Sequence, residues 1–518
     1  MRRRLGSTPA RAATPPDGTD RLSTHLAVDL GAESARAFIG EVGGAGLRMT
    51  EVGRQSHRPL LLADRVAWDA TGIFDFIVRT LESVEGPLDS VSIDGWGVDF
   101  GLLREDGSLV GMPRSYRDHL FDGSDERLAS RLRPAEVYRR TGIQFLQFNT
   151  LNQLLTLAEE RPAELETART LLLLPDLFRH WLGAPPAAER TNASTTQLLA
   201  LDGTWSAELL AGAGLNPSLF PEVIDSLALT GECRVGRPGV PLVAGPSHDT
   251  AAAVAGTPFG GSRPAAFISS GTWSIVGIEA AAPSVTAEAM ALNLSNEHGV
   301  GNTTRLLRNV MGLWLLQRCR HAWLDSDGHS PTYAELMSEA AAVPFGVSLI
   351  DPDNAAFLNP DDMPRAIADY CLATGQEPPL GRAEFTRCIY DSLALRYRWV
   401  LDAITGVSGV LPEIINIVGG GSANPLLCQA TADASGLPVV AGPSEAAVTG
   451  NVLVQAVTVG TLSNLQAGRH LLEQSHGLAH YEPSGDPRWN ILWNRFLELP
   501  GVGSPWPDRS PASGSSRI

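Results

Sequence analysis

Short apolar runs that end in glycine-rich or polar turns recur along the chain and predict the strands of an α/β protein. The first two runs, HLAVDL at 25–30 and residues 35–42, are joined by a turn at 31–34 and predict a hairpin. Residues 266–279 have the same layout around a Ser-Gly-Thr turn. A single short match is weak evidence of duplication. Residues 415–440 add a strand, a triple-glycine turn, a helix and another strand, which strengthens this interpretation.

The remaining pattern predicts helices at 73–84, 392–405 and 446–460. It also predicts a strand at 91–103 that carries the acids Asp94 and Asp99. At 518 residues the chain exceeds what one hydrophobic core usually holds, so two domains are expected. We place them at 23–256 and 257–500. Residues 1–22 and 501–518 have linker-like composition and are expected to be a disordered extension and a disordered tail.

Residues 242–279 carry the most concentrated chemistry. An apolar run ends at Gly245-Pro246 and leads through Ser247-His248-Asp249 into a small-residue helix. Polar groups at the end of a buried strand are where α/β folds place their sites. Asp249 is therefore a candidate general base, although an Asp that only caps the following helix explains the pattern equally well.

Charge and composition narrow the classes of function. The formal charge of -17 argues against a nucleic-acid partner, because phosphate backbones need a basic surface. The chain contains no lysine, so Walker A sites, protein-kinase sites and Schiff-base chemistry are excluded. Five cysteines without a CxxC pair argue against a zinc site and against a disulfide framework. With no apolar run long enough for a membrane span or a signal peptide, we expect a cytoplasmic protein without a membrane partner.

The triple glycine at 419–421 has two interpretations. Glycine lets the backbone approach a ligand without an intervening side chain, but it also permits tight packing of a strand on a helix. Taken alone, the motif favours packing. The two hairpin turns and Asp249 between them favour contact with a ligand instead, because several such segments occur in a fixed order along the chain.

These segments resemble the FGGY family of carbohydrate kinases, within the actin-like ATPase superfamily. The similarity extends over about residues 24–470, and its motifs are VDLGAESAR, SIDGWGVDFGLL, TGIQFLQFNTL, RTNASTTQL, SHDTAAAV, SSGTWS, NEHGVGNTTRLLRNVMGLWLLQRC and IVGGGSANPLLCQATADASG. The resemblance implies an α/β fold of two actin-like (ribonuclease H-like) domains with a cleft between them. It also implies ATP and Mg²⁺ as co-substrate and cofactor.

The resemblance further implies a role for individual residues. Asp249 would accept the proton of the sugar hydroxyl, and Asp29 would reach Mg²⁺ through water. The residues expected to contact the sugar are Gly97, His248, Asp249, Thr250 and Asn309. The residues expected to contact ATP are Ala32, Glu33, Ser34, Ala35, Arg36, Thr272, Gln317 and Gly420. Glu33 departs from the family pattern, and because its carboxylate would repel phosphate we expect it to point to solvent.

The implied reaction is ATP-dependent phosphorylation of a ketose, for which L-rhamnulose is the expected acceptor. Alternatives are another FGGY kinase acting on fuculose, xylulose or ribulose, and a non-catalytic protein that senses sugar or ATP. A serine hydrolase is less consistent with the sequence, which has no GxSxG motif. We expect a monomer with the ketose and ATP as its only partners.

Overall fold

The computed structural model describes residues 22–505 except 32, 45, 260, 262, 328–330 and 476. The expected extension therefore lies outside the described residues except for Leu22, and so does the expected tail from 506 onward. Residues 501–505, which we assigned to the tail, instead pack on the core. Val502 is buried, and the carbonyl of Gly503 accepts a 2.9 Å hydrogen bond from Trp399.

The first half of the chain forms a six-stranded sheet with the order β11-β12-β6-β1-β2-β3. β1 pairs antiparallel with β2, and β6 pairs parallel with β1. Side chains of β1 alternate between the two faces, so Leu26 and Val28 join one hydrophobic core and Ala27 joins another. The strands are β1 (Ser23–Leu30), β2 (Ser34–Gly43), β3 (Gly46–Ser56), β6 (Ser90–Gly95), β11 (Ala228–Glu232) and β12 (Pro241–Ala244).

The second half forms a seven-stranded sheet with the order β15-β16-β14-β13-β17-β18-β19. Apart from the extra edge strand β15, its pairing repeats that of the first sheet: an antiparallel meander, two parallel strands and an antiparallel edge strand. The predicted duplication is therefore confirmed. The strands are β13 (Ala265–Ser270), β14 (Trp273–Ala280), β15 (Ser295–His298), β16 (Thr304–Met311), β17 (Ile414–Val418), β18 (Val439–Ala441) and β19 (Ala479–Tyr481).

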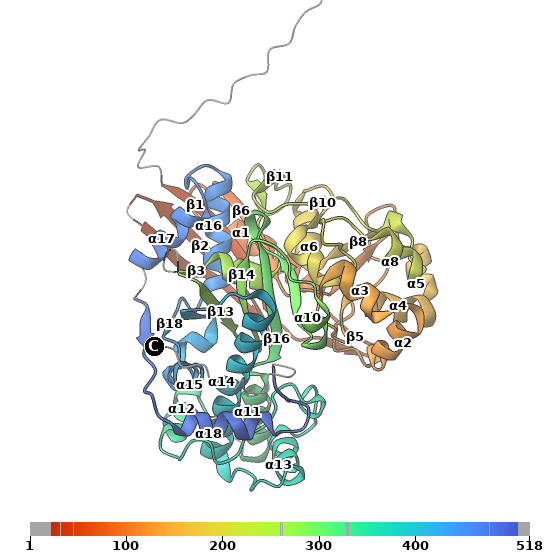
Figure 1. The fold of residues 1–518 in the computed structure, drawn as a ribbon. Helices are drawn as coiled ribbons and strands as arrows, with labels where there is room; N and C mark the ends of the chain where they lie inside the picture. The colour runs from red at the N-terminus through yellow and green to blue at the C-terminus, as the bar shows by residue number, and fades with distance from the viewer. Residues whose placement is uncertain are drawn as a thin grey trace, which may run out of the picture.

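Two helices lie between the sheets and join the halves (Figure 1). α9 (Asp249–Ala255) follows β12 of the first sheet, but its Val254 packs on Phe267 of the second. α16 (Ala446–Thr458) follows β18 of the second sheet and packs on the first, where Val452 meets Ala27. The helices cross at Gly450, where a Cβ atom would lie 1.9 Å from a carbonyl oxygen of α9. This close crossing fixes the start of α9 between the two sheets.

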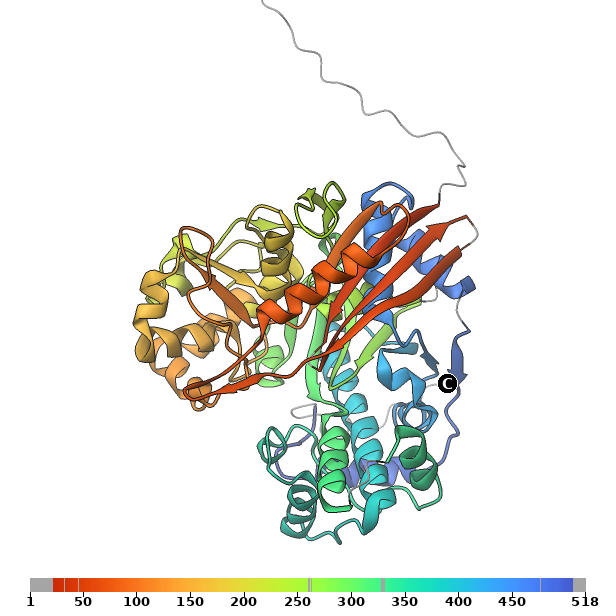
Figure 2. The same ribbon diagram turned by 180° about the vertical axis from the view of Figure 1, so that it is seen from behind.

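Further helices cover the outer faces. α1 (Ala70–Ser83) crosses the face of the first sheet opposite α16 (Figure 2). The first half also contains α2 (Ser124–Arg131), α3 (Pro134–Thr141), α4 (Thr150–Glu160), α5 (Pro162–Thr167), α6 (Leu174–Leu182), α7 (Arg190–Ala193) and α8 (Ala207–Gly212). The second half contains α10 (Ala287–Ala291), α11 (Trp314–Asp327), α12 (Tyr333–Ala341), α13 (Met363–Ala373), α14 (Gly381–Ser408), α15 (Pro425–Ser435), α17 (Leu465–Ser475) and α18 (Arg488–Leu497). None of the helices in the described ranges is long and apolar enough to cross a membrane.

Two predicted elements differ from the structure. The strand expected at 91–103 is split, because Val98 adopts a φ of 68° and the chain leaves the first sheet after β6. β7 (Phe100–Leu103) pairs instead with β8 (Thr170–Leu173) in a small two-stranded sheet. Among the described residues, two more such sheets pair β4 (Leu60–Leu62) with β5 (Arg65–Ala67) and β9 (Ala188–Glu189) with β10 (Val223–Ile224). The helix expected at 392–405 is the central part of the 28-residue α14.

Candidate active site

A cleft of about 470 Å³ lies between the two halves, where the strand ends of both sheets meet. Both hairpin turns, the start of α9 and the triple glycine line it. The structure brings together most of the residues singled out from the sequence. Those that line the cleft are Asp29, Glu33, Ser34, Arg36, Gly97, His248, Asp249, Thr250, Thr272, Asn309, Gln317 and Gly420.

Two of the residues expected to contact ATP are not placed there. Ala32 lies outside the described residues. Ala35 is fully buried in the core beneath the first sheet and does not line the cleft, because β2 already starts at Ser34 and turns the Ala35 side chain inward. Glu33 lines the cleft and is exposed to solvent, as expected.

Asp249 is the first residue of α9, and its loop is held from below by Glu189. The Glu189 carboxylate accepts hydrogen bonds of 3.0 Å from both the backbone N–H and the hydroxyl of Ser247. His248 occupies the N-cap position, and no side chain caps the helix there. The alternative that Asp249 caps a helix starting at Thr250 is therefore wrong. A carboxylate at a helix start that lines a cleft is available for chemistry.

Burial and the nearby charge of Asp29 together raise the pKa of Asp249 to about 7, although hydrogen bonds from Thr250 act in the opposite direction. The Asp249 side chain keeps 34% exposure. A carboxylate with a pKa near neutrality can accept a proton and release it again in each catalytic cycle.

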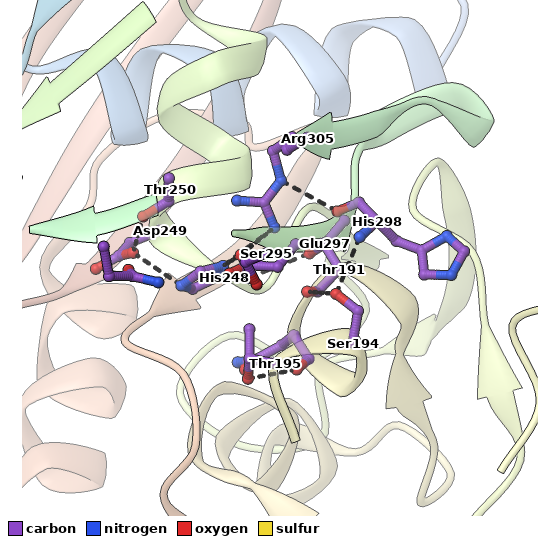
Figure 3. Close-up of polar contacts among 12 residues, drawn as sticks. Thr191, Ser194, Thr195, His248, Asp249, Thr250, Ser295, Glu297, His298 and Arg305 are labelled. Carbon is purple, nitrogen blue, oxygen red and sulfur yellow. Dashed lines mark hydrogen bonds and ion pairs between the residues drawn. The ribbon is translucent and has the colours of Figure 1, made fainter. Parts of the chain in front are cut away.

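His248 connects Asp249 with a buried ion pair from the second half of the chain (Figure 3). Its Nε2 lies 3.5 Å from Oδ1 of Asp249, and its Nδ1 lies 3.2 Å from Nη2 of Arg305. Arg305 is inaccessible to solvent and lies 3.1 Å from Oε2 of Glu297. Burial and the Arg305 charge lower the pKa of His248 well below its ordinary value, so the imidazole is neutral.

A second charged group surrounds Arg36, which also lines the cleft. Its guanidinium contacts the carboxylates of both Asp29 and Glu445, and Glu445 occupies the N-cap position of α16. Mg²⁺ usually takes one or two carboxylates together with waters and phosphate oxygens. Asp29 lines the cleft and fits that donor set. No cluster of three or more acidic, His or Cys side chains suited to a metal occurs among the described residues.

The two interpretations of the triple glycine apply to two different residues, Gly421 and Gly420. A Cβ at Gly421 would lie 2.0 Å from the Ser270 hydroxyl, so this glycine permits the β17 turn to pack on β13. A Cβ at Gly420 would meet no protein atom within 4 Å, and Gly420 lines the cleft. Gly421 is therefore a packing glycine, whereas Gly420 keeps open a space that a ligand can fill.

The remaining wall combines amides with aromatic rings. The side chain of Asn309, on β16, donates a 3.0 Å hydrogen bond to Gln144, which fixes both amides at the cleft. Phe148 contacts Tyr116 in its own half and Trp273 in the other, with ring centroids 5.1 and 5.6 Å apart. Polar groups on an apolar wall suit a sugar, which has hydroxyls and C–H faces.

Three functional candidates escaped the sequence analysis: Glu297, Arg305 and Glu445. For Glu445 a signal was present, since Gly442-Pro443-Ser444 before α16 repeats Gly245-Pro246-Ser247 before α9. For Arg305 and Glu297 there was none, because only the antiparallel pairing of β15 and β16 brings them together across the hairpin.

Comparison with known proteins identifies the class. Residues 24–256 match the FGGY family of carbohydrate kinases, N-terminal domain, and residues 266–459 match its C-terminal domain. The chain belongs to the FGGY family of carbohydrate kinases and is a sugar kinase.

Curated relatives narrow the similarity further. The chain is 42% identical over 481 residues to the rhamnulokinase of Bacteroides thetaiotaomicron, which covers 91% of this chain and 98% of that protein. It is 40% identical over 483 residues to the rhamnulokinase of Pectobacterium atrosepticum, covering 92% and 96%.

Solved structures support the same fold at lower identity. Gluconate kinase from Lactobacillus acidophilus superposes with a TM-score of 0.74 at 15% identity, and xylulose kinase from the same organism with 0.73 at 14%. Each comparison covers 92% of this chain and 98% of the other. The expected two-domain α/β fold is confirmed.

Proposed function

We propose that the protein transfers the γ-phosphoryl group of ATP to L-rhamnulose and forms L-rhamnulose 1-phosphate. The observation that carries the proposal is the position of Asp249, a carboxylate of near-neutral pKa in a cleft shared by both hairpin turns. The curated relatives named rhamnulokinase support the choice of ketose. Asp249 takes the proton of the attacking hydroxyl while the hydroxyl oxygen bonds to the γ-phosphorus, and ADP leaves.

In this proposal both halves contribute to each binding site. His248, Thr250, Gly97 and Asn309 hold the ketose against Asp249. Ser34, Arg36 and Thr272 contact the phosphates of ATP, and Gln317 and Gly420 line the nucleotide site. Asp29 would hold Mg²⁺ through water, and the bound ion would neutralise charge on the phosphates. Phosphoryl transfer depends mainly on positioning and charge stabilisation, which backbone donors of hairpin turns can supply without lysine.

The experiment is an ADP-release assay with L-rhamnulose, L-fuculose, D-xylulose and L-ribulose, run with the wild type and with Asp249→Asn. We expect the highest kcat/KM with L-rhamnulose, and loss of release in the variant. A higher kcat/KM with another ketose would reassign the substrate within the family. ADP release that no ketose stimulates, despite binding of ATP and ketose, would instead support the sensor alternative. Size-exclusion chromatography tests the expected monomer.

A further inference from the structure

His248 has two ring nitrogens, and its two neighbours place different demands on them (Figure 3). Nδ1 lies 3.2 Å from Nη2 of Arg305, and Nε2 lies 3.5 Å from Oδ1 of Asp249. A guanidinium can only donate hydrogen bonds. The contact with Arg305 therefore requires a lone pair on Nδ1, and a neutral imidazole then carries its single proton on Nε2.

The Nε2 proton points toward the catalytic carboxylate. Oδ1 of Asp249 also receives a 3.1 Å hydrogen bond from the Thr250 hydroxyl. Both side-chain donors thus act on Oδ1, and Oδ2 becomes the oxygen that accepts the hydroxyl proton of the ketose. Contacts of this length in a ligand-free site commonly shorten once the substrate is bound.

Glu297 would favour the opposite tautomer if Arg305 were absent. Its Oε2 lies 3.5 Å from Nδ1 of His248, a position from which a carboxylate attracts an Nδ1 proton. In the structure this oxygen is engaged by the charge of Arg305 at 3.1 Å. Arg305 is itself fixed by complete burial and by a 3.1 Å hydrogen bond from its Nε to the carbonyl of His298.

We propose that Arg305 is a positioning residue for phosphoryl transfer: it holds His248 in the Nε2–H tautomer, and that N–H orients the Asp249 carboxylate. The inference rests on the proposed role of Asp249 as the general base. Arg305 belongs to β16 of the second half and Asp249 to the first half. The base is therefore in its working geometry only when the two halves are packed together.

The first test reads the tautomer directly, by nitrogen NMR of full-length protein labelled at histidine, with the His248 signals assigned from His248→Gln. We expect a neutral Nε2–H imidazole in the wild type and in Arg305→Lys, which keeps a donor. In Arg305→Met we expect an Nδ1–H imidazole facing Glu297. A wild-type Nδ1–H tautomer, or Nε2–H retained in Arg305→Met, would overturn the proposal.

Arg305→Met leaves a buried carboxylate unpaired, so this variant risks unfolding. Arg305→Met/Glu297→Met removes the whole pair, a change that buried ion pairs often tolerate. In this double variant neither tautomer is enforced, and we expect signals from both. A single Nε2–H form in a folded double variant would show that Arg305 does not select the tautomer.

The second test asks whether Arg305 acts through His248. We expect Arg305→Met/Glu297→Met to lower kcat by roughly 10²-fold while the KM for ATP is unchanged, and Arg305→Lys to lose less than about tenfold. His248→Gln keeps an amide N–H near the Nε2 position without any tautomer. On that background, removing Arg305 and Glu297 should lower kcat little further.

If the losses multiply on both backgrounds, Arg305 has only a structural role and the proposal fails. The NMR result does not depend on turnover. An inactive wild type with the Nε2–H tautomer would therefore contradict the proposed function and leave the tautomer assignment intact, whereas an active wild type with the Nδ1–H tautomer would contradict the assignment alone.

Discussion

Apart from the edge strand β15, the two sheets have the same strand order and pairing, so positions at their cleft ends can be compared one by one. Gly31 and Gly271 open equivalent hairpin turns, with N–H groups bonded to Ser34 and Trp273. The equivalent pairs that follow are Asp29 with Ser269, Asp94 with Val418, and Asp249, the first residue of α9, with Ala446, the first residue of α16. Each pair has an acid in the first half and an uncharged residue in the second.

The difference has a physical consequence. Burial and the charge of Asp29 raise the pKa of Asp94 well above its ordinary value, and the same two causes raise the pKa of Asp249. The first half thereby provides a base and a carboxylate for a cation. The second half has uncharged residues at these positions, and its two acids that line the cleft, Glu297 and Glu445, are paired with Arg305 and Arg36, so its hairpin turn can approach phosphate with less repulsion. A duplicated framework thus supports two different kinds of binding surface.

Of the changes to the compared positions, replacing Asp249 should have the largest effect. Asp249→Asn keeps the shape of the side chain but cannot accept a proton, so we expect kcat to fall by at least 10²–10⁴-fold while ATP still binds. The ADP-release assay and calorimetric titration with ATP measure the two quantities. Asp75→Asn on α1, exposed and outside the cleft, is the control and should retain wild-type turnover. A turnover within a few-fold of wild type for Asp249→Asn would remove the base from the mechanism.

The pH dependence should follow the same carboxylate. Because the pKa of Asp249 is about 7, the fraction able to accept a proton falls roughly tenfold per pH unit below that value. We expect kcat/KM for the ketose to decline accordingly from pH 7 to pH 5. A profile that stays flat down to pH 5 would mean that the catalytic group is already ionised there.

The proposed nucleotide site of the second half is tested at the adjacent glycines Gly420 and Gly421. Gly420→Ala places a methyl group in open space that the nucleotide is proposed to occupy, so we expect the KM for ATP to rise by roughly tenfold with thermal stability unchanged. Gly421→Ala is the matched comparison, and we expect it to lower Tm because its methyl group meets Ser270. Equal stability and equal KM in both variants would contradict the division between these positions.

The stability of the fold should depend on pH because of the buried carboxylate of Asp249. The pKa of Asp249 is raised from 3.8 to about 7, so the folded state holds a proton that the unfolded chain releases between those values. This group's contribution to stability is therefore lost as pH rises through that interval. We therefore expect the Tm of Asp249→Asn minus the Tm of the wild type to be larger at pH 8 than at pH 4. A difference in Tm that does not change with pH would argue against the raised pKa.

The smallest expected effect is one of shape. An open cleft would pass the phosphoryl group to water, so we expect ketose and an ATP analogue together to bring the halves closer. Solution scattering should then give a smaller radius of gyration. An unchanged radius would mean that the cleft is already closed without ligands.

The sequence predicted the framework well, because its signals are local. Apolar runs with glycine turns defined both hairpins, and the residues before α9 indicated a site at Asp249. The interruption at Val98 was hidden, since its positive φ depends on packing rather than on residue type. The unbroken helical residues on either side of 392–405 were missed as well.

Parts of the site that depend on contacts between the halves could not be predicted. The contacts of Arg305 and Glu297 with His248 join residues from the two halves of the chain, and no spacing in the sequence reports them. Ala35 shows the reverse case. Its place in a turn motif suggested contact with ATP, yet strand alternation directs its side chain into the core.

The central claim is that Asp249 faces the reacting hydroxyl while turns from both halves hold ATP. A crystal structure with L-rhamnulose and a non-hydrolysable ATP analogue tests it most directly. We predict a ketose hydroxyl within about 3 Å of the Asp249 carboxylate, with the terminal phosphate beyond it beside the turn at 270–272. A ketose whose hydroxyls all lie beyond hydrogen-bond reach of Asp249 would contradict the account.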